Sequence, residues 1–172
     1  MGGTLVFLFL RVLHVLLAAV WLGATVFVSL LLMPAVNAAG PAGGQIMISL
    51  NKRIVPFFAS LGGLTVLTGI YLYWRFTGGF DPVISRSNAG MAFGIGGVAG
   101  VLAAIIGGSV VGRSSKRVVE ILQQVATMGD GAQKTSMIQE ADGLKQRMAT
   151  FGAVVLVLQI VATVLMGLGH YI

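Results

Sequence analysis

His14 and His170 are the two histidines of this chain, and both lie in apolar segments. Imidazole is a good ligand for haem iron. A b-type haem also needs an apolar slot and cations for its propionates. If Arg11 marks a membrane boundary, His14 lies about one turn deeper and His170 lies at the level of Arg11. The sequence therefore predicts a haem b site with His14 and His170 as axial pair and Arg11 and Arg75 near the propionates. Trp21 is expected to pack inside the protein or against the ligand.

Copper is the alternative metal for these residues. Met91 and Met166 lie at depths similar to the histidines, and thioether plus imidazole suits copper. Either methionine could also replace one histidine on haem iron. Methionine is a common core filler as well. His14 could instead be a neutral imidazole hydrogen-bonded across the protein interior, and His170 could sit among lipid headgroups.

The composition places these residues in a membrane protein. Of 172 residues, 56% are hydrophobic and 9% are charged, whereas a soluble domain carries about 25% charged residues. This excludes a soluble globular enzyme and a nucleic-acid-binding module. The absence of cysteine excludes disulfides, iron–sulfur clusters and thiolate metal sites. No hydrolase motif is present, and no catalytic residue is predicted.

Four apolar stretches predict an all-α integral membrane protein with a four-transmembrane-helix up-down bundle. It forms a single membrane domain over residues 1–172. Pro34 is expected to end the first helix, and a loop of small residues from Gly40 to Gly44 should follow. Pro56 is expected in the first turn of the second helix, and Ser87 or Asn88 caps the third. The predicted spans are approximately residues 5–33, 54–74, 89–111 and 151–171.

The basic residues predict the orientation. Eight Lys and Arg residues lie on one side of the predicted spans and three on the other. The positive-inside rule then places both termini outside, in the periplasm of a bacterial plasma membrane (cell inner membrane). Residues 112–150 become a cytoplasmic extension. Helical spacing on both sides of Gly129–Gly131 predicts that this extension is a helical hairpin.

Polar and small residues mark the helix faces that should point inward. In the first helix these are Arg11, His14, Ala18, Trp21, Thr25 and Ser29. In the fourth helix they are Gln159, Thr163, Met166 and His170. In the third helix a ridge consists of Gly96, Gly100, Ala104, Gly108 and Gly112.

Short motifs in the first and second helices resemble a known group of proteins. "LRVLHVLLAAVWLGATVF" and "LTVLTGIYLYWRF" are similar to segments of the copper-resistance D-like (CopD-like) four-helix membrane proteins. The matching residues are His14, Trp21, Gly23, Thr68 and Gly69. The wider group is similar to the HemJ-type protoporphyrinogen oxidases, four-helix proteins that bind haem through an early histidine. The resemblance implies a haem-ligand role for His14.

We therefore expect a haem b-binding membrane protein of the electron-transfer or oxidoreductase type. One alternative is a cofactor-free accessory subunit of a larger membrane complex, indicated by the 25 glycines and the lack of a catalytic constellation. Another is a copper-handling membrane protein. The expected partners are the lipid bilayer, a membrane redox partner or larger complex, and a second copy in a homo-oligomer.

Overall fold

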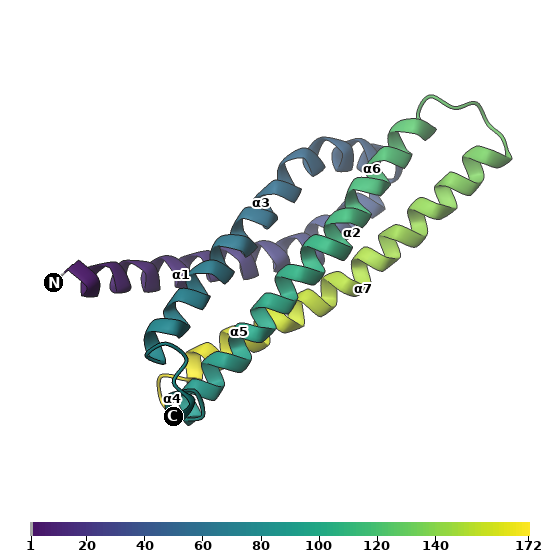
Figure 1. The fold of residues 1–172 in the computed structure, drawn as a ribbon. Helices are drawn as coiled ribbons and strands as arrows, with labels where there is room; N and C mark the ends of the chain where they lie inside the picture. The colour runs from purple at the N-terminus through teal and green to yellow at the C-terminus, as the bar shows by residue number, and fades with distance from the viewer. Residues whose placement is uncertain (1) are drawn as a thin grey trace.

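The computed structural model describes residues 2–172, and within that range it contains helices and no strand. Four stretches are long and apolar enough to cross a membrane, so the chain is an all-helical protein with four candidate membrane spans. They are Gly3–Ala38, Ala42–Phe76, Asn88–Val125 and Ala132–Leu168. The elements are α1 (Gly2–Phe27), η1 (Val28–Leu32), α2 (Met33–Ala38), α3 (Gly40–Phe76), α4 (Pro82–Ser85), α5 (Asn88–Ile106), η2 (Gly107–Gly112), α6 (Arg113–Val125) and α7 (Ala132–Leu168). In Figure 1, α3, α5–α6 and α7 run along a similar direction, whereas α1 crosses them at an angle.

The first helical path does not end at Pro34, so that prediction is wrong. The path continues through the π-helical turn η1 into α2 and stops at Ala38. In this wider turn the backbone N–H of Met33 donates to the carbonyl of Val28, five residues earlier. A π turn just before a proline leaves room for its ring and tolerates its missing N–H.

The predicted loop of small residues is mostly helix as well. α3 begins at Gly40, so Gly43 and Gly44 lie in its first turns and Pro56 lies inside the helix rather than at its start. The turn needs glycine at two positions. Gly40 has a positive φ of 56°, and a Cβ at Gly43 would lie 1.9 Å from the carbonyl oxygen of Val36. α2 therefore packs tightly against the first turns of α3.

Residues beyond the third predicted span form a helical hairpin, as the spacing predicts. α5, η2 and α6 follow one another without a break, and α6 packs along the first half of α7 (Figure 1). Val118 and Ile121 of α6 are fully buried. At the surface, Nε of Arg117 donates to Glu140 at 2.9 Å.

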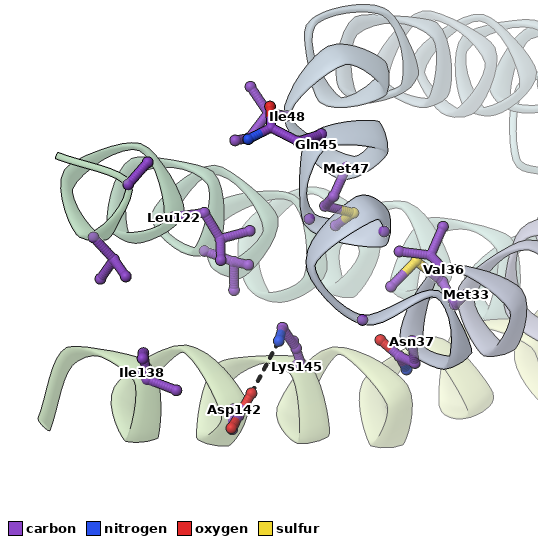
Figure 2. Close-up of a pocket in the computed structure, with 16 residues that line it drawn as sticks. Met33, Val36, Asn37, Gln45, Met47, Ile48, Leu122, Ile138, Asp142 and Lys145 are labelled. Carbon is purple, nitrogen blue, oxygen red and sulfur yellow. Dashed lines mark hydrogen bonds and ion pairs between the residues drawn. The ribbon is translucent and has the colours of Figure 1, made fainter. Parts of the chain in front are cut away.

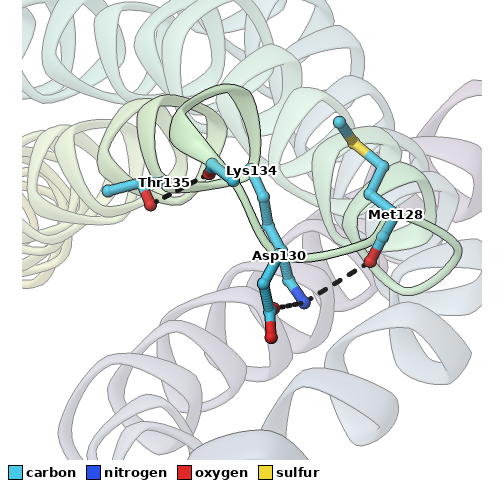
Figure 3. A network of polar contacts seen from close by, with 5 residues as sticks. Met128, Asp130, Lys134 and Thr135 are labelled. Carbon is cyan, nitrogen blue, oxygen red and sulfur yellow. Dashed lines mark hydrogen bonds and ion pairs between the residues drawn. The ribbon is translucent and has the colours of Figure 1, made fainter.

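The hairpin loop carries its own ion pair. Nζ of Lys134 lies 2.7 Å from Oδ1 of Asp130 and 3.5 Å from the carbonyl oxygen of Met128 (Figure 3). The hydrogen bond and the charge of Lys134 lower the pKa of Asp130 below its ordinary value. The pair ties the first turn of α7 back to the loop.

Small residues bring the candidate spans together around one core. Trp21, Leu61, Ala103 and Val155, one from each span, form the buried cluster. A Cβ at Gly62 would meet the Trp21 ring at 3.2 Å. The core therefore depends on a large side chain from α1 filling space that glycine leaves on α3.

Candidate functional site

His14 packs directly against α3. Its Nδ1 lies 3.0 Å from Oγ1 of Thr68. A Cβ at Gly69 would lie 2.9 Å from Cε1 of the ring, closer than real contacts allow. The imidazole is half-buried and occupies the space that Gly69 leaves open. Thr68 and Gly69 therefore fix the position of the ring together.

The Thr68 hydroxyl is hydrogen-bonded to one ring nitrogen of His14 and lies near two backbone carbonyls. Oγ1 of Thr68 has a single hydrogen, and it faces the carbonyl oxygens of Leu64 at 2.7 Å and Thr65 at 3.0 Å. When the hydroxyl donates to one of these carbonyls, it accepts from His14, and Nδ1 then carries the proton. In that tautomer the lone pair of the ring is on Nε2.

His170 lies in a different set of contacts. The guanidinium of Arg11 donates to Nε2 of His170, which joins α1 to the residues after α7. The ring also makes an edge contact with Phe93 of α5, at 5.2 Å between centroids and 87° between planes. Within residues 2–172, no hydrogen bond or aromatic contact joins His170 to His14. The structure thus brings Arg11 and His170 together, and it pairs His14 with Thr68.

The other predicted site residues differ in burial. Trp21 is 6% exposed and lies in the core, on the predicted inward face of α1. Met166 of α7 packs against α5, where a Cβ at Gly96 would meet its Cγ at 3.2 Å. Met91 is 48% exposed, and Arg75 is exposed at the end of α3. Whether any of them contacts a ligand stays a prediction.

The predicted ridge of small residues on the third helix is only partly used for packing. A Cβ at Gly96 would lie 3.2 Å from the carbonyl oxygen of Ala162, so α5 and α7 approach closely there. At Gly100 and Gly108 a Cβ would meet nothing within 4 Å. The close approach is therefore confined to one part of the ridge.

Gln159 is a buried polar side chain near the middle of α7. It is 4% exposed, and neither Nε2 nor Oε1 has a hydrogen-bond partner among the residues that the structure describes. Its backbone carbonyl accepts from the hydroxyl of Thr163 at 2.8 Å. Burying an amide without a hydrogen bond lowers the free energy of unfolding, so the native structure contains a destabilising group at Gln159.

Some contacts of this region were not predicted from the sequence. Phe93 contacts both Phe76, at 5.1 Å between centroids, and His170. A Cβ at Gly169 would lie 2.8 Å from the Phe93 ring. The one signal in the sequence is a phenylalanine among the glycines of α5, which is too common in membrane helices to single out.

These features define a class: an all-helical protein with four candidate membrane spans and a histidine held between the first two. Among residues 2–172, no group of three or more His, Cys, Asp or Glu side chains could hold a metal ion. Comparisons with family models, curated proteins and solved structures gave no match.

Proposed function

We propose that this chain is a haem b-binding membrane protein of the electron-transfer or oxidoreductase type, with His14 as the iron ligand. The observation that supports it is the hydrogen bond between Nδ1 of His14 and Oγ1 of Thr68, in which the imidazole would donate. Metal-ligating histidines usually donate through the second ring nitrogen, which sets the tautomer and the ring orientation. The gap at Gly69 leaves room for the ring in this position.

A single histidine ligand fits the contacts better than a bis-histidine pair. Nε2 of His170 accepts from Arg11 and is therefore not free to coordinate. In the proposal His170 positions Arg11, and Arg11 and Arg75 serve the propionates at that end of the protein. Bound haem supplies one-electron transfer. Thr68 orients the His14 ring, and buried Trp21 keeps water out of the core below it.

The proposal includes an orientation in the bilayer. Arg53 and Arg75 are 22 residues apart on α3, which corresponds to about 33 Å of helix and matches the hydrocarbon core. With eight Lys and Arg residues on the hairpin side and three on the other, the hairpin is cytoplasmic and both termini are outside. This gives the up-down bundle in a bacterial plasma membrane.

The test is an absorption spectrum of the protein in mild detergent, oxidised and after dithionite, from cells supplied with haem. We expect a Soret band and a reduced α band in the wild type, and their loss in His14→Ala. His170→Ala is the matched control and should keep the bands. A wild type that stays colourless would overturn the proposal. In that case stoichiometric copper would favour copper handling, and co-purifying membrane proteins would favour an accessory subunit.

A further inference from the structure

A cavity of about 640 Å³ lies between the α2–α3 corner and the hairpin. Met33 and Met47 come from the two arms of the corner, and Leu122 comes from α6 (Figure 2). This volume is in the range of sites that hold a small organic ligand. The cavity is distinct from His14, which contacts the other end of α3.

The position of the cavity makes its apolar lining unusual. Its residues on α3 lie between Gly40 and Ile48. Lys52 and Arg53 follow them, and the apolar part of α3 begins after this basic pair. Its residues on α6 and α7 lie in the hairpin. This inference rests on the proposed orientation, in which the hydrocarbon core lies between Arg53 and Arg75. The α3 residues that line the cavity lie outside that core, where apolar side chains would otherwise face water. A ligand with an apolar portion would remove that surface from water.

One basic and one acidic side chain line the cavity, and the basic one has donors left for a second carboxylate. Nζ of Lys145 lies 2.9 Å from Oδ1 of Asp142, and Figure 2 shows this pair at the cavity. An ammonium has three donors, so Lys145 can hold a second carboxylate. Asn37 and Gln45 also line the cavity, and neither side chain makes a hydrogen bond within residues 2–172.

The excess of basic residues around the hairpin also favours an anionic ligand. All four acidic residues on this side of the spans are paired: Asp130 with Lys134, Asp142 with Lys145, and Glu120 and Glu140 with Arg117. The remaining basic residues of this side have no acidic partner in the described part of the chain. They are Lys52, Arg53, Arg113, Lys116 and Arg147. The surface therefore attracts anions.

We propose that this cavity binds a single-chain anionic amphiphile, a long-chain fatty acid, with its carboxylate at Lys145 and its chain against Met33, Met47 and Leu122. A free fatty acid is favoured over a bilayer phospholipid because, in the proposed orientation, the α3 residues that line the cavity lie beyond Lys52 and Arg53, outside the hydrocarbon core.

The experiment uses the full chain in nanodiscs and a photoactivatable palmitic acid with a diazirine on its chain, followed by peptide mapping. We expect labelling in residues 33–48 and 118–126, with palmitate competing at least tenfold better than hexadecanol. Labelling confined to residues 54–74, 89–111 and 151–168, or equal competition by the neutral alcohol, would overturn the proposal. Labelling of those residues by probe dissolved in the bilayer shows that the photochemistry worked.

Two lysines give a matched pair of variants. Lys145→Gln should reduce labelling of the cavity about tenfold. Lys134→Gln removes the same kind of ion pair on the same helix, away from the cavity, and should leave labelling unchanged. Equal labelling of Lys145→Gln and the wild type would contradict the proposal.

A second variant fills the cavity directly. Gly44 lines the cavity, and a Cβ there would lie 3.9 Å from Cδ1 of Leu122, so a larger side chain enters the space. Gly44→Phe with unchanged helical content should lose the labelling, and retained labelling would contradict the proposal. His14→Ala should label like the wild type, so this result and the haem result are independent.

Discussion

Arg11 and His170 are 159 positions apart in the sequence, and the guanidinium of Arg11 donates to Nε2 of His170. This bond joins the first candidate span to the residues after the last one. Phe93 of α5 supports the same ring by an edge contact. Side chains from α1 and α5 and from just after the last span therefore meet at His170. The remaining span, α3, contacts His14 through Thr68.

Arg11→Gln should loosen the end of α7. Removing this charge-assisted hydrogen bond is expected to cost about 1 kcal/mol locally, or roughly fivefold in opening. Hydrogen exchange at residues 168–172 should accelerate by that factor. Arg86→Gln is the control, because Arg86 makes no side-chain hydrogen bond within residues 2–172. Unchanged exchange in Arg11→Gln would show that the Phe93 contact alone holds the terminus.

Gly69→Ala should displace the His14 ring. The added methyl group would lie 2.9 Å from Cε1, so we expect a loss of about 1–3 kcal/mol in stability, seen as a lower thermal midpoint in detergent. Gly63→Ala is the matched control on the same helix, because a Cβ there meets nothing within 4 Å. It should be neutral or stabilise by up to about 1 kcal/mol through helix propensity. A similar effect of both substitutions would contradict the packing of His14 on Gly69.

Thr68→Val tests the effect of the hydrogen bond that orients the His14 ring while the ring itself is kept. The substitution keeps the shape of the side chain but removes the hydroxyl that is hydrogen-bonded to Nδ1. If His14 binds haem, the variant should keep the Soret band with a shifted reduction potential, because the hydrogen bond raises the basicity of the ligand. Redox titration of the wild type, Thr68→Val and Thr68→Ser measures this. An unshifted potential in Thr68→Val would argue against coordination through His14.

Gln159→Leu should stabilise the protein. The amide is buried without a partner among the described residues, and an apolar side chain of similar size removes a penalty of about 1–3 kcal/mol. Gln139→Leu, on the exposed surface of the same helix, should change little. Chemical or thermal unfolding in detergent compares the two. Destabilisation by Gln159→Leu would mean that the amide binds water or another molecule in the folded protein.

Lys134→Gln should raise the pKa of Asp130 towards its ordinary value. The pair with Lys134 keeps that pKa low, so the interaction is present at neutral pH and is lost as pH falls through the lowered pKa of Asp130. NMR titration of the Asp130 carboxyl measures the shift. Little change in global stability is expected, because Asp130 is exposed and surface pairs contribute little. An unchanged titration would show that the two groups do not interact in solution.

The sequence determines the helical class and the number of candidate spans. Long apolar stretches can satisfy their backbone hydrogen bonds in lipid only as helices, and this depends on local composition. The inward face of α1 also follows from spacing, since Trp21 and Thr25 are buried while Leu5 and Phe9 are exposed. The hairpin followed from helical spacing on both sides of Gly129–Gly131.

The tertiary structure decides where helices end and which side chains meet. A proline usually stops a helix, but the widened turn of η1 accommodates Pro34, and this depends on packing of α2 against α3. Depth along the helices predicts that His14 and His170 share a ligand site, and this stays a prediction. The structure decides the contacts of the two rings, which are Thr68 for His14 and Arg11 for His170. Spacing along one helix predicts which face of the helix a residue occupies. Which residue it contacts depends on how the neighbouring helices are rotated and on how closely glycines let them approach.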